Sequence, residues 1–249
     1  MIQTLISEVH QLREENVKLF QELSRHHQVL YNFINLVNNN LISKNLKYYT
    51  KRSASVSTAE FIIKNANNAK LFDDKASNLK YALSQVELDG LYLEFGVFKG
   101  ETINLISSEK KDKIIYGFDS FEGLPEDWRS GVPQKTFDTK GILPQVNENV
   151  RLIKGWFDDT LPNFVEEHSE NCAFIHVDSD IYSSARTIFS FLKNRIVSGT
   201  VISFDEYFNY PGWQNGEYKA FMEFVEESDI KFEYLSYNVN AEQVTVKIK

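Results

Sequence analysis

The chain has 249 residues, of which 42% are hydrophobic and 19 are phenylalanines, and it carries a net charge of −8 at pH 7. This length allows one α/β domain plus an extension, and the acidic balance argues against nucleic acid or an anionic membrane as a partner. No apolar run approaches the length of a membrane span, and the N-terminus lacks the hydrophobic segment of a signal peptide. The single cysteine, Cys172, lies in an apolar stretch, so we expect it in the core of a cytoplasmic protein.

Residues 2–37 show a heptad pattern without glycine or proline, in which nine of the eleven core positions are apolar. The a positions are Ile2, Val9, Asn16, Leu23, Leu30 and Val37, and the d positions are Leu5, Leu12, Leu19, His26 and Phe33. This pattern predicts a coiled coil, and Asn16 at an a position favours a parallel, in-register homodimer through residues 2–37. The alternative is a long amphipathic helix packed on its own domain, because Phe20, Ile34 and other apolar residues widen the apolar face.

A run of three asparagines and a basic stretch then indicate a linker. Ser57, with Glu60 three residues later, is expected to cap a helix, and a further helix is expected over 75–85. The predicted division is a coiled-coil helix at 1–40, a linker at 41–56 and the main domain at 57–249.

From residue 91 onward, strand patterns alternate with helical patterns, which predicts a parallel, doubly wound, Rossmann-like α/β sheet. The expected strands are 91–95, 114–118, 150–154, 173–178, 199–204, 232–236 and 243–248. The expected helices are 101–109, 158–168, 182–194 and 216–228. The last two strands have no helix between them, so this seven-stranded sheet should end in an antiparallel edge hairpin. Such sheets bind ligands at the carboxyl ends of their strands.

The first of these strands runs into a turn with two glycines, Gly96 and Gly100, and then into a helix. Gly96 lets the backbone turn sharply and approach a ligand, and the helix N-terminus points unpaired N–H groups at the same place. The glycine spacing differs from that of the dinucleotide fingerprint. Glu94, an acid at the end of the strand, suits a ligand with a cationic amine such as S-adenosyl-methionine.

Asp119 ends the second strand about 20 residues after the glycine turn, where an acid can accept hydrogen bonds from both hydroxyls of a ribose. A turn or cap aspartate is the alternative. The long segment that follows is expected to form a functional lid. Arg129 and Lys135 in it are candidate substrate contacts, with solvated surface charges as the favoured alternative. After the third strand, Gly155 would let the backbone approach the ligand, and Trp156 would either stack on a purine or pack under the sheet.

Four carboxylates follow two further strands: Asp178 and Asp180 after the fourth, and Asp205 and Glu206 after the fifth. Without compensation they would repel one another, and a hard divalent cation such as Mg²⁺ removes that cost. The alternative is a set of helix caps, with Asp180 capping the helix that follows. His176 is expected to lie within the strand, in the core.

Together these residues resemble the macrocin O-methyltransferase family, whose members are class I, S-adenosyl-methionine-dependent, Mg²⁺-requiring enzymes acting on sugar hydroxyls of antibiotics and related glycosides. The resemblance implies the class I methyltransferase fold and a sugar or glycoside acceptor. It covers roughly residues 57–249 and leaves the N-terminal heptads outside. The matching segments are 94–100, 116–125, 155–162, 178–182 and 205–207.

The resemblance also implies roles for individual residues. The residues implied to hold the cofactor are Glu94, Gly96, Asp119, Ser120, Gly155, Trp156 and Asp178. Asp178, Asp205 and Glu206 are the implied metal ligands, and Asp180 is the implied general base. The family commonly has two aspartates where this chain has Asp205 and Glu206, and glutamate reaches one methylene further.

Two other functions stay open at this point. One is a catechol-type, Mg²⁺-dependent O-methyltransferase, which shares the fold and uses similar acids. The other is a coiled-coil assembly protein that carries a degenerate methyltransferase domain.

Overall fold

The computed structural model describes residues 2–42 and 44–249, without the side chains of 40–42. Contacts divide the chain into two compact units, residues 1–52 and 53–249. No helix among the described residues has both the length and the apolar character that crossing a bilayer requires.

The N-terminal unit is dominated by α1, a helix of 35 residues over Ile2–Leu36, followed by a π-helical turn over Val37–Ile42. The predicted helix over residues 2–37 is therefore confirmed. None of the described residues of α1 is buried, so its apolar stripe is open to solvent in the single chain. The predicted coiled-coil pairing stays a prediction.

The expected linker is largely helical, because α2 spans Leu46–Asn65. Asn45 accepts a hydrogen bond from the backbone N–H of Tyr48 and takes the capping role that was predicted for Ser57. Ser57 lies inside the helix, where its hydroxyl donates to the carbonyl of Ala54. The basic and serine-rich sequence here contains no glycine or proline, so nothing in it interrupts the helix.

The main unit is built on a sheet of eight described strands in the order β1-β7-β8-β6-β5-β2-β3-β4. Their bounds are Lys70–Phe72 (β1), Leu91–Phe95 (β2), Ile115–Asp119 (β3), Val150–Lys154 (β4), Cys172–Val177 (β5), Val201–Phe204 (β6), Phe232–Asn238 (β7) and Val244–Ile248 (β8). All neighbouring pairs are parallel except β6–β8 and β7–β8. The predicted doubly wound α/β fold is confirmed.

The outer edge of the sheet differs from the prediction in two respects. The last two strands do pair antiparallel, but β8 inserts between β6 and β7. The short strand β1 then pairs with the open side of β7 and forms an eighth, outermost strand. Three residues carry too little alternation to predict a strand, and β1 exists because β7 offers it unpaired backbone groups.

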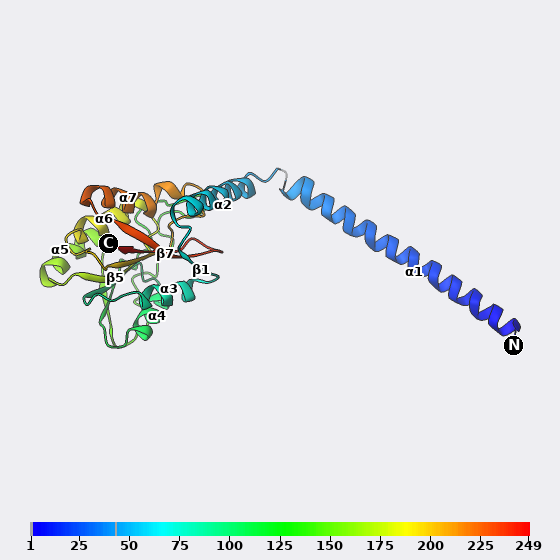
Figure 1. Cartoon of the computed structure of the whole chain (residues 1–249), viewed down its shortest axis with the longest axis horizontal. Coiled ribbons are helices and arrows are strands. Elements are labelled where there is room, and N and C mark those ends of the chain that lie inside the picture. The colour runs from blue at the N-terminus through cyan, green and yellow to red at the C-terminus, as the bar shows by residue number, and fades with distance from the viewer. Residues whose placement is uncertain (1, 43) are drawn as a thin grey trace. The chain divides into compact units, whose positions relative to one another are not determined.

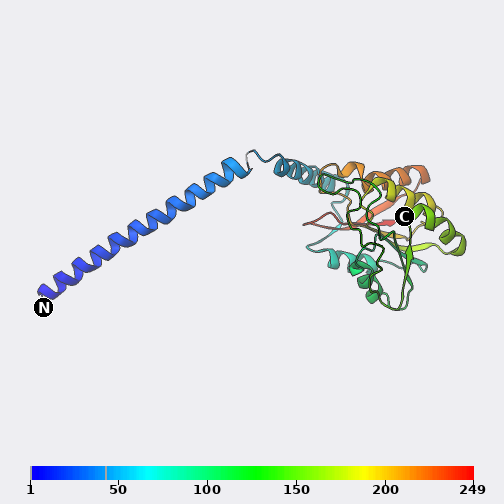
Figure 2. The same cartoon turned by 180° about the vertical axis from the view of Figure 1, so that it is seen from behind.

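Helices cover both faces of the sheet (Figures 1 and 2). Their bounds are Lys75–Ser84 (α3), Glu101–Glu109 (α4), Phe157–Glu167 (α5), Tyr182–Leu192 (α6) and Glu217–Ser228 (α7). One apolar core joins α5, α6, α7 and residues 53–65 of α2 to the first face, and a second joins α3 and α4 to the other face. Cys172 is buried in the first core, as expected.

This topology determines where a ligand binds. The chain runs from β2 to β3 and β4 on one side, and from β5 to β6 on the other, so the order reverses between β2 and β5. The crevice at the carboxyl ends of β2 and β5 is the switch point at which doubly wound sheets bind ligands.

Candidate active site

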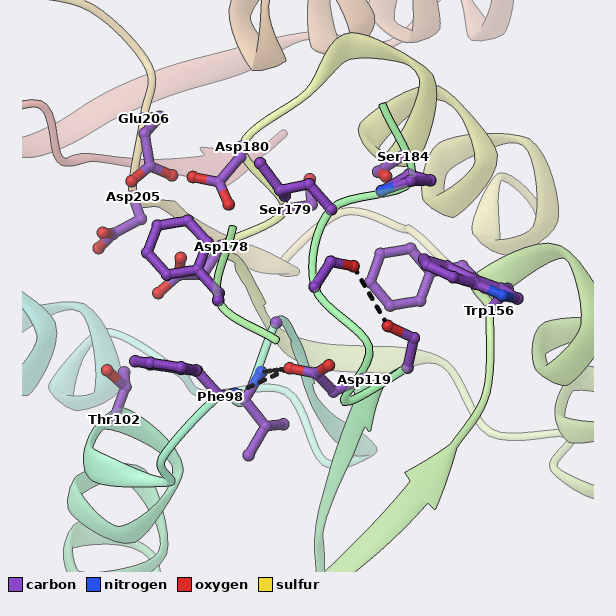
Figure 3. A pocket seen from close by; sticks show the side chains of 18 of the residues that line it. Phe98, Thr102, Asp119, Trp156, Asp178, Ser179, Asp180, Ser184, Asp205 and Glu206 are labelled. Atoms are coloured by element: carbon purple, nitrogen blue, oxygen red, sulfur yellow. Dashed lines mark hydrogen bonds between the residues drawn. The ribbon is translucent and has the colours of Figure 1, made fainter. Parts of the chain in front are cut away.

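A cavity of about 740 Å³ lies at the carboxyl ends of the parallel strands (Figure 3). It is lined by residues that follow β2, β3, β4, β5 and β6. Most of the predicted site residues therefore meet in one place. Those that line it are Gly96, Asp119, Ser120, Gly155, Trp156, Asp178, Asp180, Asp205 and Glu206.

The glycine turn after β2 is shaped by close backbone contact. Gly96 has φ +95°, and a Cβ added there would lie 1.8 Å from the carbonyl oxygen of Asp178. No other residue type fits, because a side chain would collide with the backbone at the end of β5. Phe98 follows in the left-handed region at φ +46°, which is uncommon for a residue with a side chain.

Asp119 holds this turn in place. One of its carboxylate oxygens accepts hydrogen bonds from the backbone N–H groups of Val97 and Phe98, each at 2.8 Å, and the other accepts from Phe121 at 2.6 Å. Three of its four acceptor positions are therefore occupied. In this arrangement Asp119 can accept one hydrogen bond from a ribose, whereas the sequence predicted that it would accept two.

Glu94 does not line the cavity. Its side chain is fully buried on the α3 and α4 side of the sheet, and its Oε1 lies 2.9 Å from Nδ1 of His176 on β5. Burial raises the pKa of Glu94 to about 7, although His176 opposes the shift. The crevice-facing orientation expected for Glu94 was wrong, because Glu94 alternates with Leu93 and Phe95, which face the other core. His176 lies in the core, as expected.

Trp156, the aromatic candidate for purine binding, lies on the far side of the cavity from the acids Asp205 and Glu206 (Figure 3). Trp156 is half-buried and directly precedes α5. Gly155, at φ +146°, has its backbone N–H bonded to the carbonyl of Asp119 at 3.0 Å, which ties the end of β4 to the end of β3. The side chain of Ser120 accepts a hydrogen bond from the N–H of Glu122 and so shapes the start of the lid.

The carboxylates after β5 and β6 form two overlapping groups. Ligand atoms of Asp178, Asp180 and Glu206 lie within 4.8 Å of one another, and so do those of His176, Asp178 and Asp205. In Figure 3 the carboxylates of Asp180 and Glu206 point toward each other. The predicted metal set of Asp178, Asp205 and Glu206 is thus spread over both groups, which share Asp178.

Burial and mutual repulsion perturb these acids. Burial, followed by the charge of Asp178, raises the pKa of Asp180 to about 8. Burial and the charge of Asp205 raise the pKa of Asp178 and, more strongly, that of Glu206. For Asp205, burial is outweighed by the neighbouring His176 and Lys75, which hold its pKa below the usual range.

Asp180 has an unusual backbone. Its φ is +64°, and only 7% of its surface is exposed. It does not cap α6, because the residue before that helix is Ile181 and no side-chain cap is present there. The cap alternative for Asp180 is therefore wrong. Left-handed backbone at a residue with a side chain costs free energy, and such strain clusters at functional sites.

Two residues of the site were not found from the sequence. Glu217, the first residue of α7, is fully buried and accepts hydrogen bonds from the backbone N–H groups of Ser179 and Glu206. Lys75, the first residue of α3, reaches Asp178 and Asp205 with its ammonium group. Both begin helices, a position where a charged residue usually points into solvent, so their sequence context gave no signal.

The segment 120–149 passes over the cavity without helix or strand, and Gly123, Leu124, Pro125 and Phe137 line the cavity. The two charged residues that were candidate substrate contacts lie outside its lining. Arg129 instead pairs with both oxygens of Glu242, at 3.0 and 3.1 Å, and stacks on Trp128. Lys135 lies on the exposed surface.

The family model described as macrocin-O-methyltransferase (TylF) matches residues 1–236. The chain belongs to the macrocin-O-methyltransferase family. The recognition of this family from its motifs, and with it the assignment of the chain to the O-methyltransferases, is confirmed. The match also includes the N-terminal helix, which the motifs had left outside.

Characterised relatives of this family member are distant. A demethyldecarbamoylnovobiocin O-methyltransferase of Streptomyces niveus is 23% identical over 181 residues, covering 61% of this chain and 68% of the relative. A tetracenomycin-C rhamnosyl 4'-O-methyltransferase of Streptomyces olivaceus is 26% identical over 162 residues, covering 53% and 60%. The chain thus spans about three fifths to two thirds of the length of these relatives.

Solved structures support the fold. The calicheamicin methyltransferase superposes with a TM-score of 0.56 at 19% identity, covering 69% of this chain and 77% of that one. The O-methyltransferase NovP superposes with a TM-score of 0.52 at 21% identity, covering 69% and 78%.

Proposed function

We propose that this chain transfers the methyl group of S-adenosyl-methionine to a hydroxyl of a sugar or glycoside, assisted by Mg²⁺. The observation that carries the proposal is that one cavity joins a strand-end glycine turn to a cluster of acids. Its volume of about 740 Å³ lies in the range of small-molecule sites. The cavity therefore has room for a cofactor beside part of an acceptor.

The cofactor would occupy the side of the cavity formed by β2, β3 and β4. Gly96 keeps the backbone open there, Asp119 has one acceptor position left for a ribose hydroxyl, and Trp156 offers an aromatic face for the adenine. Glu94 would not contact the cofactor directly. It would instead hold His176, whose Nδ1 lies 2.9 Å from its carboxylate, in position below the cavity. This side would place the sulfonium methyl toward the acids after β5.

The acid cluster fits a divalent cation. Oε2 of Glu206 is buried and has no hydrogen-bond partner, which is costly for a carboxylate unless a cation is present. Asp178, Asp205 and Glu206 would hold Mg²⁺, which prefers carboxylate oxygens. When bound, Mg²⁺ would lower the pKa of an acceptor hydroxyl.

Asp180 would take the proton of the acceptor hydroxyl. Its carboxylate lies within 4.8 Å of ligand atoms of Asp178 and Glu206, so it would stand beside a hydroxyl that the cation holds. With the proton on Asp180, the acceptor oxygen would attack the methyl group that bound S-adenosyl-methionine supplies, and S-adenosyl-homocysteine would leave with the electron pair of the broken carbon–sulfur bond.

A sugar acceptor is supported by the relative from Streptomyces olivaceus, whose name describes methyl transfer to a rhamnosyl derivative of tetracenomycin C. The lid contributes Phe137, and Phe98 meets it edge-on at 5.4 Å. The negative π-face of such a ring can pack against the weakly positive C–H face of a sugar ring.

Methyl transfer from isotopically labelled S-adenosyl-methionine into panels of sugars, glycosides and catechols tests the proposal. We expect product from the sugar or glycoside panel with Mg²⁺ and none with chelator. The variant Asp180→Asn should lose turnover, whereas Asp112→Asn, at an aspartate with 80% of its side chain exposed, should not. A wild-type protein that does not bind S-adenosyl-homocysteine at millimolar concentration would refute the enzyme, and product from catechols alone would refute the acceptor class.

The proposal includes a homodimer through residues 2–37 and a cytoplasmic location. The apolar positions of α1 are exposed in the single chain, with Leu12 at 58% and Leu23 at 66%, and a parallel partner would cover them. The buried free thiol of Cys172 fits a reducing compartment. Light scattering of the full chain tests the dimer, and a monomer would refute it.

A further inference from the structure

Lys75 forms ion pairs with two of the proposed metal ligands at once. Its Nζ lies 3.2 Å from Oδ2 of Asp178 and 2.6 Å from Oδ1 of Asp205. The side chain starts at the first residue of α3 and lines the cavity. The preceding residue, Asp74, caps α3 through the N–H of Ser77, so the start of the helix is firmly placed.

The surroundings of Lys75 contain more negative than positive charge. The cavity lining described here includes one further ammonium group, that of Lys99, which lies over the ring of Phe98 at 5.0 Å instead of meeting the acids. Together with His176, whose Nε2 lies 3.8 Å from Oδ1 of Asp205, Lys75 thus compensates Asp178 and Asp205 when no metal is bound. Carboxylates this close would otherwise destabilise the fold.

A metal ion would compete with Lys75 for the same oxygens. An ion at about 2.1 Å from Oδ1 of Asp205 would lie within about 4.7 Å of Nζ in its present position. A divalent and a monovalent cation at that separation repel each other. The ammonium group of Lys75 can move away from the acids into solvent, because 37% of the side chain is exposed and its stem is long and flexible.

We propose that Lys75 is a tethered counter-ion of the metal site, which holds Asp178 and Asp205 in the metal-free protein and leaves them when a divalent cation binds. This rests on the metal site of the proposed function and adds a second state to it. Lys75 therefore weakens metal binding while stabilising the metal-free fold, and so sets the Mg²⁺ concentration at which the site fills.

Calorimetry with Mg²⁺ alone, on wild type, Lys75→Met and Lys80→Met, tests the proposal. Lys80 lies on the same helix and pairs with Glu109 at 3.1 Å, so its variant removes one positive charge from α3 without touching the acids. We expect Lys75→Met to bind Mg²⁺ at least about fivefold more tightly than wild type, which corresponds to about 1 kcal/mol. Lys80→Met should bind like wild type.

Equal or weaker binding by Lys75→Met would overturn the proposal and make Lys75 a support of the ligands. Binding by none of the three proteins would refute the metal site and the proposal with it. Tighter binding by Lys80→Met as well would reduce the effect to net charge and also overturn it. In thermal scans with chelator, Lys75→Met should unfold at a lower temperature than wild type, and saturating Mg²⁺ should raise its Tm by more.

If Lys75→Met does not fold, an experiment on the wild-type protein still tests the proposal. Amine-directed labelling followed by mass spectrometry should show Lys75 reacting faster once Mg²⁺ is added, because its ammonium no longer contacts the two carboxylates. The rate at Lys80 should not change. An unchanged rate at Lys75 under Mg²⁺ concentrations that saturate the site would overturn the proposal.

Discussion

Glu217 offers the sharpest test of how the two acid-bearing loops are held. Its carboxylate accepts hydrogen bonds from the N–H of Ser179 at 3.0 Å, from the hydroxyl of Ser179 at 3.2 Å and from the N–H of Glu206 at 3.3 Å. Ser179 lies between Asp178 and Asp180. One buried side chain thus connects the loop after β5 to the loop after β6, and the variant Glu217→Gln disturbs that connection with little change of volume.

The expected effect is selective. Glutamine keeps one acceptor oxygen but turns an N–H₂ group toward a backbone N–H, so the variant loses about one hydrogen bond to the charged carboxylate that Glu217 becomes when a bound cation lowers its pKa. Such a bond contributes about 1.5–3 kcal/mol, which predicts Mg²⁺ binding weakened about tenfold to a hundredfold. The metal-free protein should not lose stability, because burial raises the pKa of Glu217 to about 8 and an uncharged amide removes repulsion with Asp178 and Asp180.

Calorimetry with Mg²⁺ and thermal unfolding in chelator measure the two effects separately. Glu223→Gln is the matched control, since Glu223 lies on the same helix and accepts a hydrogen bond from Tyr182 outside the cluster. Unchanged Mg²⁺ affinity in Glu217→Gln would contradict the positioning role. A fall in metal-free Tm with unchanged affinity would make Glu217 a purely structural residue.

Four further predictions follow from the same geometry. Gly96→Ala should abolish S-adenosyl-homocysteine binding in calorimetry and lower the Tm, because its Cβ would lie 1.8 Å from the carbonyl of Asp178. Asp180→Asn should lower turnover about 10²–10⁴-fold, the range of general-base catalysis, with cofactor affinity little changed. In chelator, stability against urea should fall as the pH rises from about 5 to 8, because folded Asp180 and Glu217, each with a pKa of about 8, hold protons that the unfolded chain has released. Asn16→Ile should raise the Tm of the full chain and broaden the distribution of oligomers seen by light scattering, because a buried asparagine trades stability for a defined pairing.

The strands of the site were predictable because each is a short run of buried residues between turn signals. β2 and β4 have the bounds that were predicted for them. Once the strands were known to be parallel, their carboxyl ends had to share one edge, which brought Asp119, Asp178 and Asp205 together. β1 and the start of α2 were missed because both depend on weak local signals that only the folded chain resolves.

The direction of a side chain at a strand end was harder to predict than its presence there. Glu94 was expected in the crevice, although its neighbours Leu93 and Phe95 are apolar residues of one core and the strand alternates. That alternation puts Glu94 on the opposite face, beside His176 on the adjacent strand. Asp119 was correctly placed, but the N–H groups that occupy its oxygens come from a turn whose conformation the sequence does not specify.

The charge balance of the site could not be predicted from the residues at the strand ends alone. Their acids are read directly from the sequence, but the groups that compensate and position them, Lys75 and Glu217, come from the first residues of α3 and α7. These helices lie on opposite faces of the sheet, so only packing brings both side chains to the same edge. Lys75 adds a cation that opposes a metal, and Glu217 adds a carboxyl group that holds the two acid-bearing loops together. The metal affinity of the cluster is therefore determined by the docking of two helices as much as by the carboxylates themselves.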